Sequence, residues 1–91
     1  MNEEPLSGAE VDVAAERREK VLWVVKGGGR WGLDLNEIAW SVRLDQRGRQ
    51  IFPSLQAVPL VQAACEQLVA MQELEGRGKF FRLVLWRHEP W

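Results

Sequence analysis

The segment LVAMQELEGRGKFFRLVLW, residues 68–86, changes its periodicity halfway along. Its first part places apolar residues at helical spacing, whereas FFRLVLW alternates β-branched and aromatic residues around Arg82, as strands do. The glycine-containing basic stretch GRGK, residues 76–79, separates the two parts and is typical of a turn. The pattern therefore predicts a helix that passes through a basic turn directly into a strand.

Length and composition limit the chain to one domain. It has 91 residues, of which 46% are hydrophobic, enough for one modest core but not for a second domain. No apolar run approaches the roughly 20 residues of a membrane span. The opening MNEEPLSGAE lacks the cationic and apolar regions of a signal peptide. We therefore expect a cytoplasmic protein that does not contact a membrane.

The net charge of −1 conceals an asymmetry along the sequence. Residues 1–19 carry six acidic and two basic side chains, which leaves seven acidic and ten basic ones in residues 20–91. The folded part is therefore mildly basic. This is compatible with a nucleic-acid surface but well short of a strongly basic one, so charge alone does not decide the partner.

The N-terminal part predicts a leader followed by a helix. Residues 1–8 combine acidic residues with proline, serine and glycine, so we expect a disordered leader. From residue 9 to residue 26, a helix would gather its apolar side chains on one face: Ala14, Val21, Leu22, Val24 and Val25. The run KVLWVVK would also suit a strand, but AAERREK before it favours a helix. The three glycines at 27–29 should end this element.

The clearest local signal is a capping box at the start of a second helix. Asp34 occupies the cap position and Glu37 stands three residues later. The helix would share one apolar face among Leu35, Ile38, Ala39 and Val42, and Trp40 would point outward. However, alternate residues from 38 to 44 are apolar and DQRGRQ follows, so residues 38–52 could instead form a hairpin. The alternative fold is then α+β with a small antiparallel sheet.

A third helix should begin after PSLQAVP, with Ser54 as a candidate cap and Pro59 near the start. Its main body is predicted over residues 59–73. The inner face would consist of Val61, Ala64, Cys65, Leu68 and Val69. The outer face would consist of Gln62, Ala63, Glu66, Gln67, Ala70 and Glu73.

Three segments carry a resemblance to a known family. VLWVVKGGGRWGLDLNEIAWSV resembles the first helix, short strand and second helix of bacterial winged helix-turn-helix regulators, LVQAACEQLVAMQELE their recognition helix, and GRGKFFRLVLW their wing. The resemblance implies a mainly α fold with a small β wing over residues 9–87, and residues 88–91 as a C-terminal tail. The chain departs from the family at Gln72, where many members have glycine, and in the longer link between residues 42 and 59.

The resemblance implies that the third helix enters the DNA major groove while the wing contacts phosphate. The residues facing base edges would be Gln62, Ala63 and Gln67. Phosphate contacts would come from the long loop and the wing, namely Arg43, Arg47, Arg49, Arg77, Lys79 and Arg82. Against this, the outer helix face carries Glu66 and Glu73 and no basic residue, and arginines in loops are commonly just solvated.

The five tryptophans are many for so short a chain. We expect most of them to supply core and boundary packing. Trp40 and Trp91 are the exceptions, the first because it points outward and the second because it is the last residue. Exposed tryptophans are enriched at interfaces, so these two predict a protein partner or a homodimer contact.

No catalytic, cofactor or metal site is evident. A lone cysteine, Cys65, and a lone histidine, His88, form no zinc ligand set or activated nucleophile, and we expect the first in the core and the second at the surface. No small-molecule substrate is indicated. The sequence therefore predicts a DNA-binding winged-helix regulator or accessory factor, with double-stranded DNA as partner. The alternative is a winged-helix protein-interaction module without DNA binding.

Overall fold

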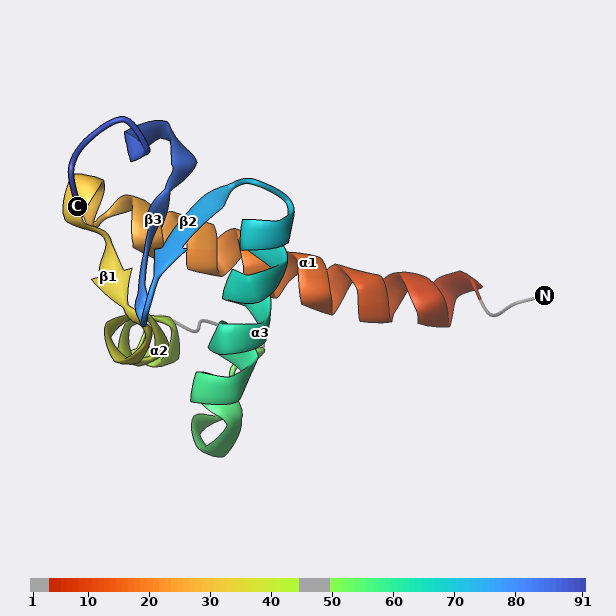
Figure 1. Ribbon diagram of the computed structural model, residues 1–91. Helices are drawn as coiled ribbons and strands as arrows, with labels where there is room; N and C mark the ends of the chain where they lie inside the picture. The colour runs from red at the N-terminus through yellow and green to blue at the C-terminus, as the bar shows by residue number, and fades with distance from the viewer. Residues whose placement is uncertain (1–3, 45–49) are drawn as a thin grey trace.

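The computed structural model describes residues 4–44 and 50–91, with side chains from residue 13 onward. The chain is mainly helical, and its three helices pack with a three-stranded antiparallel sheet (Figure 1). The helices are α1 (Glu4–Lys26), α2 (Leu35–Leu44) and α3 (Ala57–Ala70). The strands are β1 (Leu33–Asp34), β2 (Leu74–Arg77) and β3 (Phe80–Leu83), and short 3-10 turns lie at η1 (Gly29–Trp31), η2 (Ser54–Gln56) and η3 (Val84–Trp86). The prediction of a mainly helical chain with a small antiparallel sheet is confirmed.

The sheet has the order β1-β3-β2. The central strand β3 places Phe81 opposite Leu33 of β1 and Gly76 of β2. The basic stretch at 76–79 is shorter as a turn than expected, because Gly76 and Arg77 already belong to β2 and the turn consists of residues 78 and 79. Figure 1 shows the sheet lying across the C-terminal half of α1, with α3 beside β2.

The helix boundaries differ from the predicted ones at the N-terminus. Helix α1 begins at Glu4 and not at residue 9, so residues 4–8 of the expected leader are helical. Pro5 lies in the first turn, where the missing N–H of proline breaks no intrahelical hydrogen bond. The helix ends at Lys26 before the three glycines, as predicted.

The capping box decides the conformation of residues 34–44. The Glu37 amide donates to Asp34 Oδ1 at 2.8 Å, and the Asp34 amide donates to Glu37 Oε1 at 3.0 Å. These two bonds satisfy amides that a helix start leaves unpaired. Helix α2 follows immediately, so the alternative hairpin is wrong over residues 38–44, and residues 45–49 lie outside the described part of the chain.

The core lies between the three helices and one face of the sheet. Its residues are Val21, Val24, Val25, Ile38, Ala39, Val42, Phe52, Ala57, Val61, Ala64, Cys65, Leu68, Leu74 and Phe81. The predicted inner faces of α1, α2 and α3 therefore supply most of the core. Val69 is an exception: it is 38% exposed because it lies beside Leu68 on the rim of the buried face of α3.

The tryptophans pack differently from the expectation. Trp23 and Trp31 are exposed, because Trp23 lies across α1 from Val21 and Val25 and Trp31 belongs to the turn η1. Trp40 is exposed at 58%, as its position on the outer face of α2 predicted. Trp86 and Trp91 are partly buried. Branched aliphatic residues and two phenylalanines therefore fill the core without tryptophan.

Helix α3 ends at Ala70, three residues before the predicted end. The Gln72 amide donates to the carbonyl of Val69 at 3.0 Å, and the Glu73 amide donates to the carbonyl of Leu68 at 2.9 Å. This is the Schellman arrangement, which requires a left-handed residue after the helix. Gln72 occupies that position with φ of 64°. The departure noted in the sequence thus falls where glycine has the conformational advantage.

Replacing Gln72 with glycine is expected to stabilise the protein by about 1 kcal/mol, because glycine adopts a positive φ without the Cβ clash. The midpoint of urea unfolding measures the change. Met71→Gly is the matched control, since Met71 is also exposed and follows the helix but has φ of −82°. It should destabilise the protein by a similar amount, about 1 kcal/mol. Equal effects of the two glycines would contradict the explanation.

Candidate functional site

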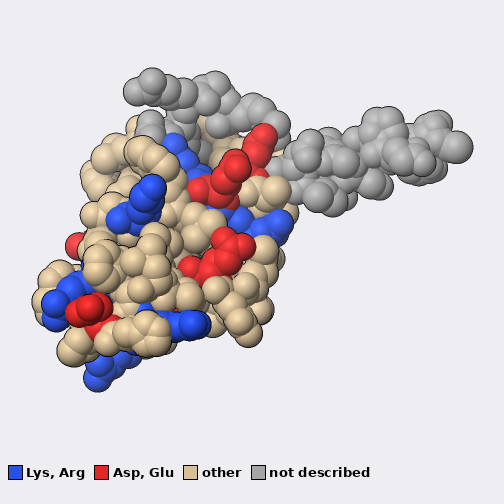
Figure 2. Space-filling model, turned by 90° about the horizontal axis from the view of Figure 1, so that it is seen from above, with Lys and Arg blue, Asp and Glu red and all other residues tan. Residues whose placement is uncertain are grey.

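On one face of the described part of the chain, charged side chains of both signs are mixed (Figure 2). On the face seen in Figure 2, lysines and arginines are interspersed with acidic side chains and separated by uncharged residues. A polyanion is bound by clustered cations, whereas mixed charges suit a more selective contact. Local geometry therefore has to identify the site.

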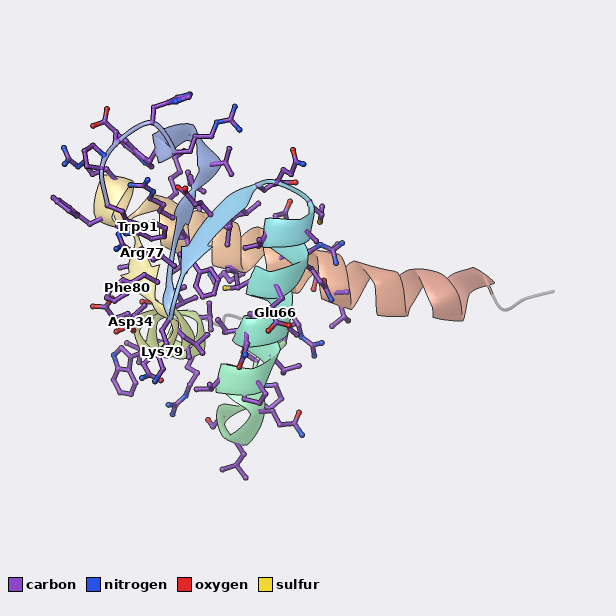
Figure 3. The ribbon with its side chains drawn as sticks, in the orientation of Figure 1. Asp34, Glu66, Arg77, Lys79, Phe80 and Trp91 are labelled. Carbon is purple, nitrogen blue, oxygen red and sulfur yellow. The ribbon has the colours of Figure 1, made fainter. Side chains whose placement is uncertain are left out.

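The outer face of the sheet, turned away from the helices, carries a connected set of polar contacts. Alternation along β3 sends Phe81 to the core and Phe80 and Arg82 to the outer face. The register places Arg77 opposite Phe80, and Glu75 opposite Arg82. Figure 3 shows Arg77, Phe80 and Trp91 along this side of the sheet.

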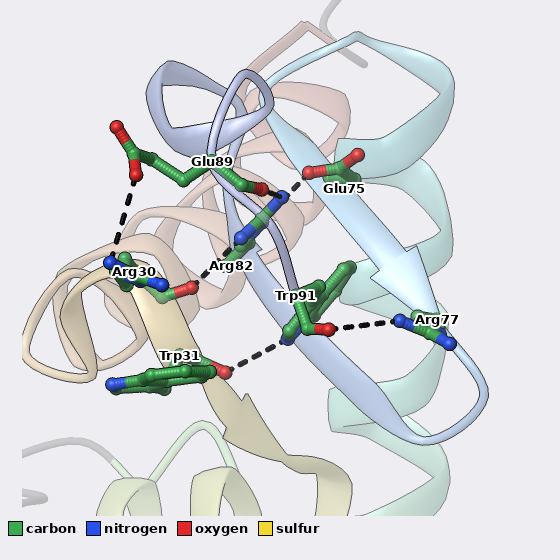
Figure 4. Close-up of polar contacts among 7 residues, drawn as sticks. All are labelled: Arg30, Trp31, Glu75, Arg77, Arg82, Glu89 and Trp91. Atoms are coloured by element: carbon green, nitrogen blue, oxygen red, sulfur yellow. Dashed lines mark hydrogen bonds and ion pairs between the residues drawn. The ribbon is translucent and has the colours of Figure 1, made fainter.

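Arg82 holds three segments together on this face (Figure 4). Its Nε donates to Glu75 Oε1 at 2.8 Å, its Nη1 to the carbonyl of Arg30 at 3.0 Å, and its Nη2 to the carbonyl of Glu89 at 2.8 Å. The side chain is only 2% exposed. Contrary to the prediction, Arg82 is not presented to a phosphate in this structure, because its side chain is buried and each of its three nitrogens donates to an acceptor inside the protein.

The residues after η3 return over the outer face and do not form a free tail. The Trp91 indole Nε1 donates to the carbonyl of Trp31 at 3.1 Å. The guanidinium of Arg82 lies 4.4 Å from the centre of the Trp91 ring, a cation–π contact. Arg77 Nη1 donates to the Trp91 carbonyl oxygen at 3.2 Å. The expectations of a C-terminal tail at 88–91 and of a freely exposed Trp91 are therefore wrong.

An open groove of about 360 Å³ lies beside this segment. It is lined by Trp31 from η1, Arg77 from β2, Phe80 from β3 and Trp91 from the C-terminal segment. We call it the aromatic groove. Trp31 is 61% exposed and Phe80 46% exposed, so both rings are accessible to a ligand. The guanidinium of Arg30, 4.6 Å from the Trp31 ring centre, supports one side of that ring.

The groove and its neighbours carry a small positive excess. The nearby cations are Arg30, Arg77, Lys79 and Arg82, and the nearby carboxylates are Asp34, Glu75 and Glu89. Glu75 pairs with Arg82, and Glu89 lies 3.7 Å from Arg30. Within the described residues, Arg77 and Lys79 have no side-chain carboxylate within ion-pair distance, and Arg77 donates instead to the main-chain oxygen of Trp91. The unneutralised positive charge of this region is therefore on β2 and its turn.

The outer face of α3 is exposed, but two of its polar side chains are hydrogen-bonded within the protein and the helix supplies no basic residue. The predicted residues Gln62, Ala63 and Gln67 are all exposed. However, Gln62 donates to Glu66 Oε2 at 3.2 Å, and Gln67 accepts from Arg18 of α1 at 2.9 Å. The helix AVPLVQAACEQLVA contains no lysine or arginine.

The remaining predicted phosphate contacts are dispersed. Arg43 is exposed on α2, with its guanidinium 5.4 Å from the Trp40 ring centre. Lys79 is exposed in the turn between β2 and β3. Arg47 and Arg49 lie outside the described part of the chain. Of the predicted site residues, Arg77 and Trp91 do lie together. The sequence predicted a phosphate contact for Arg77 and a protein contact for Trp91.

Cys65 and His88, the lone cysteine and the lone histidine, lie where the sequence predicted, the first in the core and the second at the surface. Cys65 is fully buried on the inner face of α3. Burial raises the pKa of its thiol to about 12, and the nearby Glu66 carboxylate adds to the shift. The thiolate is therefore scarce at neutral pH, and thiolate is the reactive form. His88 is exposed.

Sequence reasoning did not identify Trp31 and Phe80 as site residues. Alternation in FFRLVLW, with Phe81 inward, is the signal that places Phe80 outward. No comparable signal indicates that residues 87–91 return to meet Trp31, because that contact spans 60 residues. The aromatic groove therefore became visible only in the folded chain.

Comparisons with known proteins found nothing similar: no family model, no curated protein and no solved structure matches the chain. In the described residues, no helix has the length and apolar character that crossing a bilayer requires.

Proposed function

We propose that the chain is a winged-helix domain. The order of elements, helix, strand, helix, helix, strand and strand, supports this, as does the sheet order that places β1 beside β3. In this interpretation the hairpin of β2 and β3 is the wing and α3 corresponds to the recognition helix. Since a fold does not determine a function, the surface of α3 carries the functional argument.

We further propose that the domain is a protein-interaction module and that it does not bind DNA. The observation that carries this proposal is the outer face of α3, to which the helix itself contributes no cation and on which it presents Glu66. Phosphate contacts supply most non-specific affinity for DNA, and a carboxylate facing the phosphates opposes it. The two glutamines that would read base edges already have partners within the chain.

Exposed apolar side chains near α3 and on α2 support a protein partner. Leu55 in η2 is 98% exposed, and Val58 follows it in the first turn of α3. Trp40 and Leu44, four residues apart, form an exposed stripe on α2. Such side chains gain more from burial against another protein than from contact with phosphate. The partner is a second copy of the chain or a different protein.

DNA binding by the same fold remains the second candidate. It is favoured by Arg43 and Lys79, which are exposed and have no carboxylate partner within the described residues. In this alternative, Gln62 and Ala63 would contact base edges, Arg43, Arg77 and Lys79 would contact phosphate, and the protein would act as a transcription regulator. The two candidates predict different responses to added salt.

A titration with a mixed-sequence DNA duplex separates the two candidates. Amide NMR shifts are recorded at low salt and again at physiological salt, with wild-type protein and with an Arg43→Gln/Lys79→Gln variant. We expect no saturable shifts at Gln62, Ala63 or Lys79. Saturable shifts at these residues that weaken with salt and in the variant would overturn the proposal in favour of DNA binding.

A further inference from the structure

We infer that the aromatic groove binds a peptide segment presenting an aromatic or large aliphatic side chain next to a carboxylate. The inference rests on the proposed function and identifies the chemistry of the partner at one site. Four features support it: the lining of the groove, its charge, the donors of Arg77, and the way the protein's own C-terminal segment lies beside it.

The lining suits one large apolar side chain. Trp31, Phe80 and Trp91 supply three aromatic rings around a volume of about 360 Å³. This volume is at the lower end of the range for small-ligand sites, about 300–1,000 Å³. An aromatic ring inserted there can contact the edges and faces of the lining rings, and such contacts add to the gain from burial. The groove therefore accepts one large side chain of a partner.

Arg77 supplies the polar part of the site. Within the described part of the chain, its single hydrogen bond joins Nη1 to the Trp91 carbonyl. A guanidinium has five N–H donors, and two of them can bind one carboxylate in parallel. Because Arg77 itself lines the groove, a carboxylate adjacent to the inserted side chain lies within its reach. The site thus combines an apolar contact with a charged one.

The C-terminal segment of the protein itself lies on this face, beside the groove. Residues 87–91 have no regular secondary structure, and a Trp91 ring, a Trp91 carbonyl and a Glu89 carbonyl are held by Arg82 and Arg77. An aromatic side chain with a neighbouring backbone oxygen on an arginine is therefore already accommodated once. The adjacent groove offers the same combination, with Trp31 and Phe80 still exposed.

The charge of the region favours a peptide over a single-stranded nucleic acid. Single strands are bound by aromatic platforms within a continuous positive groove that follows the backbone. Here the carboxylates of Asp34, Glu75 and Glu89 lie close to the cations, so the side chains of the region carry an excess of only one positive charge. Such a site can neutralise the single carboxylate of a peptide. A run of phosphates would instead be repelled by the three carboxylates.

The test uses three capped tetrapeptides: Ac-Gly-Trp-Asp-Gly-NH2, Ac-Gly-Trp-Asn-Gly-NH2 without the carboxylate, and Ac-Gly-Ala-Asp-Gly-NH2 without the ring. Amide and indole NMR shifts of the full chain are followed during titration. We expect saturable shifts at Trp31, Arg77 and Phe80 with the first peptide. Loss of either the carboxylate or the ring should weaken binding by about tenfold or more.

Protein variants assign the contacts. Arg77→Gln should weaken binding of the Trp-Asp peptide about tenfold and leave the weaker Trp-Asn peptide unchanged. Trp31→Ala should weaken both. Trp23→Ala is the matched control, because Trp23 is similarly exposed and also has a cation against its ring, that of Lys20, but is outside the groove. It should leave both affinities unchanged, and the amide spectrum of each variant verifies the fold.

Three results would overturn the inference: no saturable shift with the Trp-Asp peptide, equal affinity for the Trp-Asn peptide, or equal losses from Trp31→Ala and Trp23→Ala. Tighter binding of an oligo-thymidine strand in the same groove would also overturn it. The duplex titration is distinguished from the peptide titration by the shifts of Gln62 and Ala63 on α3, so peptide binding in the groove together with duplex binding at these residues would sink only the proposed function. If neither the duplex nor the Trp-Asp peptide bound, only the groove inference would be overturned.

Discussion

Gly32→Ala is expected to destabilise the protein by about 3–5 kcal/mol, a large part of the stability of a small domain. Gly32 has φ of 70° and ψ of −163°, a conformation open essentially only to glycine. A Cβ there would lie 2.2 Å from the Phe81 carbonyl oxygen and 2.9 Å from Arg82 Cβ. Both obstacles belong to β3, so the sheet itself would have to move.

Gly29→Ala is the matched control for this prediction. Gly29 also has a positive φ, 60°, but a Cβ there would meet no atom within 4 Å. It should cost only about 1–2 kcal/mol, from the backbone conformation alone. Urea unfolding of both variants measures the difference. If Gly32→Ala were no more harmful than Gly29→Ala, the close approach of residue 32 to β3 would not exist in solution.

The second large effect is expected at Arg82. Arg82→Met should lower the free energy of unfolding by about 3 kcal/mol, because it leaves the Glu75 carboxylate and two carbonyls without their donor. Methionine preserves much of the volume, so the loss reports mainly on polar contacts. Glu75 is 35% exposed, and water limits its share of the cost.

The same variant should release the C-terminal segment. Amide hydrogen exchange at residues 87–91 is expected to accelerate in Arg82→Met, since Glu89 and Trp91 both contact Arg82. The chemical shift of the Trp91 indole N–H should move towards that of a solvent-exposed indole. Arg87→Met, which removes an exposed arginine nearby, serves as the control and should leave both signals unchanged. Unaltered exchange at 87–91 in Arg82→Met would show that Arg82 does not hold this segment.

The features that the sequence predicted correctly depend on residues that lie close together in the chain. The Asp34 and Glu37 capping box could be predicted because its two hydrogen bonds join residues three positions apart. The buried faces of α2 and most of α3 followed from helical periodicity, and the outward position of Trp40 followed from the same geometry. The sequence predicted the end of α3 at residue 73 and not at Ala70, because the positive φ that follows the helix is adopted by Gln72, where a glycine would have indicated it.

Local pattern thus determined the helices and the turn between β2 and β3, since each depends on residues within a few positions of one another. The pairing of β1 with β3 does not, because it joins Leu33 to Phe81. The tertiary structure alone decided that Arg82 is buried and that Trp91 lies against Trp31, contacts that span 52 and 60 residues. An arginine beside a basic turn looks solvated until another segment brings carbonyls to its donors. The aromatic groove has the same origin: its four lining residues come from four segments, and only packing placed them together.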